Sequence, residues 1–202
     1  MSLWLAPAPL VLASRSAARR AMLDAAGIPV ALAATDIDER AVEARAGALD
    51  PGEVAVLLAR EKARAAGAGF PGRFVVGADQ TLALGARRFT KPKDRAAARE
   101  QLRALAGHTH ELHSAVAVAR DGRVVFSHRD AARLTMRALS ERFIDAYLDA
   151  VGPDAATSVG GYQLERLGIH LFERIEGDHF TILGMPLLAL IAFLRREGQL
   201  AS

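Results

Sequence analysis

An acidic residue stands at the end of the most strand-like short run of this chain. Residues 74–81 read FVVGADQT, in which three apolar residues lead through two small ones to Asp79 and Gln80. A buried strand that ends in a carboxylate is how α/β proteins present an acid at the mouth of a cleft. Because aspartate also begins turns after strands, this stretch alone leaves a catalytic acid and a turn residue equally open.

Lysine is rare in this chain. Of its 26 basic residues only Lys62, Lys91 and Lys93 are lysine, and the others are arginine. The ammonium group is a compact point charge that a planar guanidinium does not replace. We therefore expect a task for Lys62, near the end of a helix predicted over residues 51–66, and for Lys91. For Lys93 we expect none.

A predicted strand over residues 9–13 runs into a predicted helix over residues 17–26. Either Ser14 or Ser16 can cap this helix, and its free N–H groups favour an anion. Cations normally suit the other end of a helix, so Arg19 in its first turns makes sense if it faces a phosphate group. For Arg20, a solvated side chain is an equally good interpretation.

Two clusters could hold a metal cation. The segment DIDE at residues 36–39 places three carboxylates in an expected loop, which is either a cation site or a solvated turn. His108 and His110 would share one face of a strand, as zinc ligands can. Because no third ligand is apparent on that face, we expect no zinc site at the histidines.

The composition favours a globular protein that acts on small anions. Its 202 residues are 51% hydrophobic and 24% charged, enough for one large domain or two tightly packed lobes. The chain has no cysteine, so disulfides and thiolate metal sites are excluded. A scattered net charge of +3 and 5% aromatic residues argue against nucleic acid. Without a basic leader segment or a long apolar run, we expect a cytoplasmic protein that does not enter a membrane.

Periodicity and end signals predict an α/β chain. The glycine-rich stretch 67–72 lies between a helix and a strand, the reverse of a dinucleotide-binding motif, so we interpret it as a loop. Asp121-Gly122 is a strong hairpin signal. The remaining helices are expected over residues 95–105, 140–150 and 186–194, and the remaining strands over residues 28–33, 74–84, 114–119, 123–126, 131–136, 160–164 and 169–175.

Seven motifs in register resemble the Maf family of nucleoside triphosphate pyrophosphatases. They are LASRSAARR, DIDE, LAREKA, VVGADQ, KP at 91–92, LAGHTH, and GGYQLE followed by RIEGDHFTILGMPL, between about Leu10 and Gly198. The resemblance implies one domain over residues 1–202 with an α/β fold: a mixed twisted sheet in two lobes around a central cleft, similar to inosine triphosphate pyrophosphatases. It implies hydrolysis of a nucleoside triphosphate to the monophosphate and pyrophosphate.

The resemblance also implies roles for particular residues. Arg19, Lys62 and Lys91 would clamp the triphosphate and offset charge on the leaving pyrophosphate. Glu39 and Asp79 would hold a divalent cation, Mg²⁺ or Mn²⁺, and Asp79 would be the base for the attacking water. The implied active site is therefore Ser14, Arg19, Glu39, Lys62, Asp79 and Lys91.

Three positions track substrate choice within the family, and they correspond to Ala18, Gln80 and Glu165. The branch acting on dTTP and UTP typically has Arg, Thr and Gln there, whereas the branch acting on 7-methyl-GTP has an aromatic residue, Gln and Glu. The last two match, so we expect 7-methyl-GTP or another modified purine nucleotide. The alternatives are a dTTP/UTP pyrophosphatase and a nucleotide-binding regulator of septum formation without turnover. The expected partner is the nucleoside triphosphate substrate, and whether the protein forms a homodimer is left open.

Overall fold

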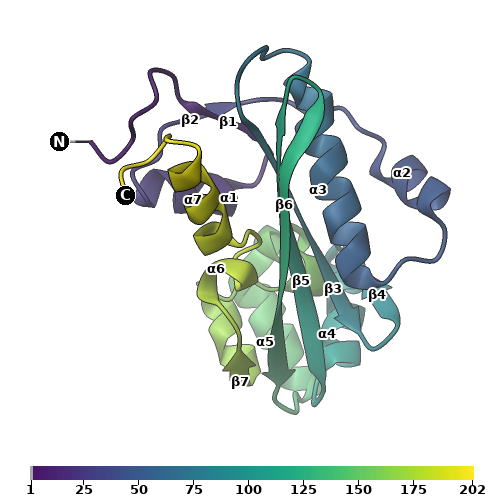
Figure 1. Cartoon of the computed structure of the whole chain (residues 1–202). Helices are drawn as coiled ribbons and strands as arrows, with labels where there is room; N and C mark the ends of the chain where they lie inside the picture. The colour runs from purple at the N-terminus through teal and green to yellow at the C-terminus, as the bar shows by residue number, and fades with distance from the viewer. Residues whose placement is uncertain (1) are drawn as a thin grey trace.

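A computed structural model describes residues 2–202, and its centre is a mixed seven-stranded sheet (Figure 1). The strand order is β2-β1-β3-β5-β6-β7, and β4 pairs with the far end of β3. β1 runs parallel to β2 and β3, while all other pairs are antiparallel. The strands are β1 (Leu10–Ala13), β2 (Val30–Leu32), β3 (Val75–Leu84), β4 (Arg87–Phe89), β5 (Thr109–Arg120), β6 (Arg123–Met136) and β7 (Phe172–Glu176).

Seven α-helices lie within residues 2–202, and six of them begin at a polar cap. Each cap side chain accepts a backbone N–H of the first turn, which satisfies a donor that has no partner in the helix. The helices with their caps are α1 (Ala17–Ala25, Ser16), α2 (Glu39–Ala46, Asp38), α3 (Pro51–Gly67, Asp50), α4 (Arg95–Leu105, Asp94), α5 (Glu141–Val151, Ser140) and α6 (His179–Ile182, Asp178); α7 (Leu187–Arg196) follows Pro186.

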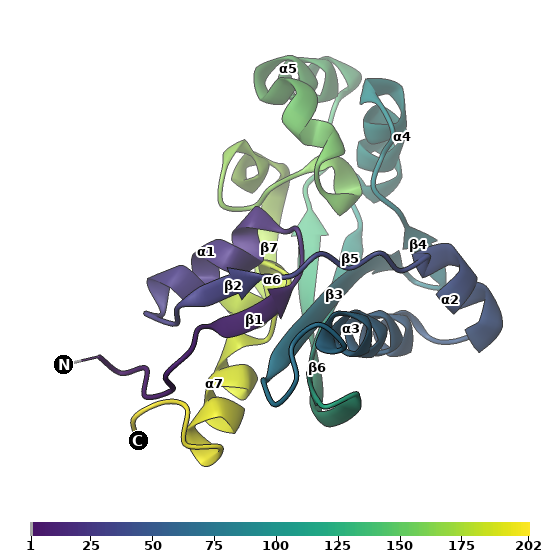
Figure 2. The same cartoon turned by 90° about the horizontal axis from the view of Figure 1, so that it is seen from above.

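Two apolar clusters pack on one side of the sheet, at different ends of it. One contains Leu82 of β3 together with residues of α4 and α5. The other contains Val76 and Ala78 of β3 together with residues of α1 and α7. Figure 2 shows these two groups of helices apart from one another, with α3 beside β3. The predicted α/β fold with a mixed sheet is confirmed, and the two clusters are the cores of its two lobes.

The structure corrects three predictions of local structure. The acidic segment 36–39 is not wholly a loop, because Asp38 caps α2 and Glu39 is the first residue of that helix. Residues 160–164 are not a strand, because Gly160 and Gly161 take positive φ angles of 83° and 75°, which no extended strand allows. Short 3₁₀ helices lie at Gly152–Ala156, Val159–Gly161 and Leu167–Leu171. The strand expected over residues 169–175 therefore begins only at Phe172, the first residue of β7.

The hairpin after α4 is longer than predicted. β5 begins at Thr109 instead of residue 114, and β6 runs without a break to Met136. The expected strands at 123–126 and 131–136 are thus one strand, with a bulge opposite Val118 and Ala119. Among residues 2–202, every helix is too short or too polar to traverse a lipid bilayer.

Candidate active site

The pairing of β3 is interrupted on one edge. β1 ends at Ala13, opposite Gly77, and β4 pairs only from Leu82 onward. No strand formed by residues 2–202 therefore covers residues 78–81 on this edge. The other edge stays paired with β5 throughout. Side chains alternate along a strand, so Asp79 and its neighbour Gln80 reach this gap from opposite faces of the sheet.

Gly77 allows α3 to lie close against β3. A methyl group at Gly77 would collide with the carbonyl oxygen of Ala59 and approach the backbone nitrogen of Ala63 to 2.6 Å. The missing side chain therefore sets the separation of helix and strand. Lys62 lies in the same turn of α3, and this packing brings its side chain to Asp79 two residues beyond Gly77.

Lys62 joins two carboxylates. Its Nζ lies 2.6 Å from Oδ1 of Asp79 and 2.8 Å from Oε1 of Glu39. The Lys62 and Asp79 side chains are both 11% exposed, whereas that of Glu39 is 50% exposed. A buried carboxylate requires such a partner, because an unpaired charge inside a protein is strongly destabilising. Glu39 forms the open side of this cluster.

Burial makes Asp79 a better proton acceptor. Loss of solvent raises the pKa of Asp79 above its ordinary value, against the opposing charges of Lys62 and Arg19. Glu39 adds a smaller contribution in the same direction as burial. A carboxylate with a raised pKa holds a proton more tightly, as a general base near neutral pH must.

Ser14 and Arg19 lie beside this cluster, at the start of α1. Ser16 caps the helix, and Ser14 Oγ accepts instead from the Ser16 backbone N–H at 3.2 Å and from Arg19 Nη1 at 3.3 Å. Arg19 also donates from Nη1 to the Ala78 carbonyl oxygen at 2.9 Å. Its guanidinium therefore spans the uncovered edge of β3. Arg20 is exposed and pairs with Asp24, as its solvated interpretation predicts.

The other predicted site residues lie outside this network. Lys91 is exposed and makes no hydrogen bond or ion pair with any residue between 2 and 202, and Ala18 is half-buried on α1. Glu165 is an exposed turn residue that follows the incorrectly predicted strand at 160–164. The segment before it packs on β3, because a methyl group at Gly160 would lie 2.8 Å from the Leu82 side chain.

Sequence reasoning did not identify the groups that hold Gln80. Its Nε2 donates to Ser114 Oγ at 3.0 Å and to the carbonyl oxygens of Thr181 and Ile182 at 3.1 and 3.0 Å. Ser114 and Thr181 are fully buried. The only sequence signal was the polar type of Ser114 inside an apolar strand, and it does not reveal a partner 34 residues away.

His110, one of the two candidate zinc ligands, lies inside the protein. His110 is fully buried, and its Nε2 lies 2.7 Å from the Tyr162 hydroxyl. Burial lowers the pKa of His110 to about 4, so the ring is neutral at physiological pH. No group of three or more acidic, histidine or cysteine side chains within residues 2–202 is arranged to hold a metal ion.

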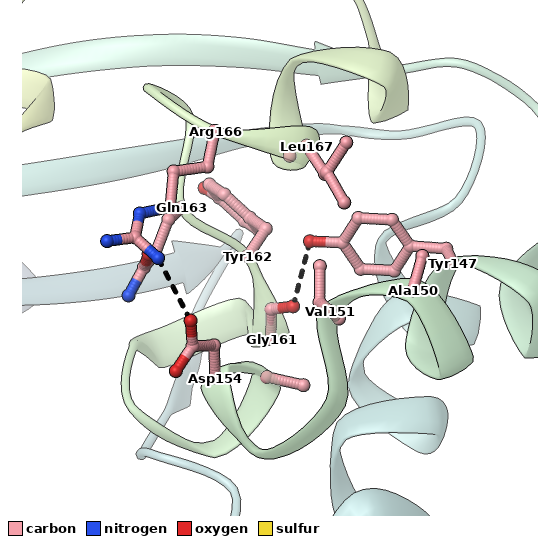
Figure 3. Close-up of a pocket in the computed structure, with 11 residues that line it drawn as sticks. Tyr147, Ala150, Val151, Asp154, Gly161, Tyr162, Gln163, Arg166 and Leu167 are labelled. Carbon is pink, nitrogen blue, oxygen red and sulfur yellow. Dashed lines mark hydrogen bonds and ion pairs between the residues drawn. The ribbon is translucent and has the colours of Figure 1, made fainter.

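A surface pocket is lined by residues that precede and follow Glu165 in the sequence (Figure 3). It is bounded by Tyr147 of α5 and by Gln163 and Arg166, and Arg166 pairs with Asp154 at 3.0 Å. Its volume of about 190 Å³ is below the roughly 300 Å³ at which small-molecule sites begin. None of the predicted site residues lines it, so this pocket is distinct from the cluster at β3.

The model of the family described as Maf-like protein matches residues 9–197. The chain belongs to the Maf family. A protein of Rhodopseudomonas palustris named nucleoside triphosphate pyrophosphatase is 59% identical over 201 residues, which are 100% of both chains. One of Bradyrhizobium diazoefficiens with the same name is 58% identical over the same lengths. A protein of Brucella abortus named 7-methyl-GTP pyrophosphatase is 52% identical over 93% of this chain and 96% of its own.

Proposed function

We propose that this Maf protein hydrolyses a nucleoside triphosphate to the monophosphate and pyrophosphate, with 7-methyl-GTP or another modified purine nucleotide as its preferred substrate. Family membership and relatives matched over their full length support the enzyme class, a hydrolase of nucleoside triphosphates. The choice of base and the use of a divalent cation are our inference from the residues at the site.

The observation that carries this proposal is the position of the Lys62 ammonium between Asp79 and Glu39 at the uncovered edge of β3. Asp79 is buried and has a raised pKa, which suits it to deprotonate a water molecule for attack on the α-phosphorus. Lys62 and Arg19 place positive charge beside the same edge. Such fixed charges stabilise a leaving pyrophosphate without reorganisation during the reaction.

The carboxylates also fit a divalent cation. Oxygens of Asp79 and Glu39 both lie within 2.8 Å of one ammonium nitrogen, so the two side chains already converge on a single positive charge. Mg²⁺ is commonly held by one or two carboxylates together with substrate phosphates and water. When bound there, the cation would supply Lewis-acid stabilisation of phosphate charge.

Lys91 and Ser14 complete the proposed phosphate site. Lys91 is exposed, and a long side chain on a surface loop can reach a bound triphosphate as a point charge. Ser14 is buried at the N-terminal end of α1, where a hydroxyl and the positive end of the helix dipole favour an anion. The charge of Lys91 and the position of Ser14 support these two roles.

Gln80 and Glu165 support a purine base. Glu165 is an exposed carboxylate, and a carboxylate can accept from the N1 and the exocyclic amine of guanine. It would also favour the positive charge of a 7-methylated ring and repel the carbonyl oxygens of uracil and thymine. Ala18 offers no ring for stacking, unlike the aromatic residue usual in the branch that acts on 7-methyl-GTP. The Brucella relative named for 7-methyl-GTP favours the same choice.

The test is a measurement of pyrophosphate release from 7-methyl-GTP, GTP, dTTP and UTP with Mg²⁺ or Mn²⁺. We expect the highest kcat/KM for 7-methyl-GTP, and we expect Glu165→Gln to narrow its advantage over UTP. Glu173→Gln, at an exposed glutamate of β7, is the matched control. A wild-type preference for dTTP or UTP would contradict the choice of base, and nucleotide binding without any pyrophosphate release would favour the regulator.

A further inference from the structure

The orientation of the Gln80 amide is fixed by chemistry. Its nitrogen faces the Thr181 and Ile182 carbonyl oxygens, which can only accept hydrogen bonds. Ser114 Oγ donates to the Thr181 carbonyl oxygen at 2.6 Å, so its lone pair remains for the Gln80 nitrogen at 3.0 Å. Turning the amide over would place its oxygen against these acceptors. The NH₂ group must therefore point inward.

This arrangement follows from the fold around Gln80. Ser114 is the cross-strand partner of Gln80 in the β3–β5 ladder, so both side chains lie on the same face of the sheet. The two carbonyls belong to the last residues of α6, where carbonyl groups lack partners inside the helix. The turn that follows α6 also binds Arg19, since the Gly184 carbonyl oxygen accepts a hydrogen bond from Arg19 Nε at 2.8 Å. One short segment thus fixes two residues of the site.

We propose that Ser114 is a positioning residue that, with the two carbonyls, locks Gln80 so that only its side-chain oxygen faces a bound base. The oxygen makes no hydrogen bond within residues 2–202, and Gln80 is half-buried beside Arg19. An amide locked in this way is a pure acceptor. It selects a base edge that presents N–H groups and disfavours one that presents a carbonyl oxygen.

The inference rests on the proposed function only in placing a nucleobase beside Gln80. The alternative is that the same bonds merely fasten α6 to the sheet. The two differ in what loss of the Ser114 hydroxyl does. If the hydroxyl positions the Gln80 amide, its loss should change the preference between bases, mainly through KM. If it only fastens α6, its loss should lower the turnover of every nucleotide by the same factor, because α6 is followed by the turn that binds Arg19.

The kinetic test compares Ser114→Ala with wild type on GTP and on 1-methyl-GTP, in which a methyl group replaces the N1 proton. We expect the preference for GTP to fall about fivefold, the loss that one net hydrogen bond represents, mainly through KM. Ser114→Thr should restore it. Ser127→Ala, which removes a half-buried hydroxyl of β6 that contacts Arg60, should not change it. An equal loss on both nucleotides would overturn the proposal.

A second measurement needs no folded variant at Ser114. In the NMR spectrum of wild-type protein, the Gln80 side-chain NH₂ signal, assigned by its disappearance in Gln80→Leu, should exchange slowly with solvent. It should shift little when 7-methyl-GMP or UMP is added. Fast exchange or a large shift would show that the nitrogen faces the base, and would refute the locked acceptor. Because this result does not depend on which nucleotide is the best substrate, it separates this inference from the proposed function.

Discussion

The two faces of β3 at the site differ in the type of interaction that holds their side chains. On one face, Asp79 lies in an ionic cluster with Lys62 of α3. On the other face, Gln80 lies in a neutral network of a hydroxyl and backbone carbonyls with Ser114 and α6. The two residues are neighbours, so one step of about 3.3 Å along the strand separates charged from neutral surroundings.

This difference indicates that chemistry and base selection are supported by separate parts of the molecule. α3 fixes the charged face through Gly77, whereas β5 and α6 fix the neutral face. We infer that substitutions on the charged face reduce turnover of all nucleotides by a common factor. Substitutions on the neutral face should change the ratio between nucleotides. The following experiments test that division.

The largest effect is expected from Asp79→Asn. Loss of a general base typically reduces turnover by about 10²–10⁴-fold, and we expect the same factor for every nucleotide. Steady-state pyrophosphate release on purine and pyrimidine substrates measures it. Asp24→Asn, at an exposed residue paired with Arg20, is the control and should leave rates unchanged. Retention of a tenth of wild-type activity in Asp79→Asn would refute the assignment of the base.

Substitution of Lys91 should lower the turnover of all nucleotides, as substitutions on the charged face do, although Lys91 does not contact Lys62, Asp79 or Glu39. Lys91→Ala should lower kcat by about 10²-fold, the usual cost of one fixed donor to a developing charge. Lys93→Ala is the matched control, because Lys93 is also exposed and lies two residues away. Equal losses in both variants would contradict a specific role for Lys91. A loss confined to one base would place Lys91 with base recognition instead.

His110 lies on the neutral face, two residues before Leu112 and four before Ser114 along β5. Its folded-state pKa of about 4 is below the ordinary 6.5, so the unfolded chain binds the extra proton between these values. Stability is therefore full above pH 6.5 and falls as the pH drops toward 4, by about 3 kcal/mol in total. Urea unfolding from pH 7 to 4 measures this loss.

The control for His110 is a pair of glutamine substitutions. His110→Gln should flatten the acid slope, whereas His128→Gln, at an exposed residue of β6, should leave it unchanged. An unaltered slope in His110→Gln would show that other groups dominate acid unfolding. Catalytic rates at neutral pH should not follow this slope, because the ring carries no charge there.

The smallest change concerns Gly77→Ala. The added methyl group meets the backbone of α3 at Ala59 and Ala63, so the helix must shift away from β3. Overpacking of this kind typically costs about 1–3 kcal/mol of unfolding free energy. The shift should also separate Lys62 from Asp79 and lower kcat for all nucleotides. Thermal unfolding and steady-state rates measure both effects.

Gly67→Ala is its matched control. Gly67 lies in the last turn of the same helix, and a methyl group there would meet nothing within 4 Å. A Gly to Ala change at a compatible position stabilises by about 0.4–1 kcal/mol through the unfolded chain. If Gly77→Ala were as well tolerated as Gly67→Ala, close packing of α3 would not be what places Lys62.

Local signals predicted the charged face better than the neutral face. The apolar run before Asp79 is a local pattern of a few residues, and the rarity of lysine is a property of the composition. Both can therefore be read directly from the sequence. The start of α2 at Glu39 was missed, because three clustered acids resemble a solvated loop until Asp38 is seen as a cap. The bonds of Gln80 to Ser114, Thr181 and Ile182 span 34 to 102 residues, and no periodicity reveals them.

Backbone conformation explains the remaining error. In residues 160–164, Tyr162 and Leu164 alternate with Gly161 and Gln163 as in a strand, but two adjacent glycines take left-handed conformations there. Glycine permits this backbone without requiring it, so the sequence alone does not distinguish the two. The turn that carries Glu165 therefore follows a 3₁₀ helix instead of the expected strand.

The outer edge of β6 has a consequence for the behaviour of the protein in concentrated solution. β7 pairs with β6 only between Arg133 and Met136, so no described strand covers residues 123–132. Unpaired strand edges invite the edge of another molecule and promote aggregation. Here exposed Arg123, Arg129 and Asp130 line the strand, and Asp130 binds the backbone N–H of residue 131 with its own side chain. Charged side chains at a strand edge disfavour pairing with another copy, and here they lie along the longest strand of the sheet.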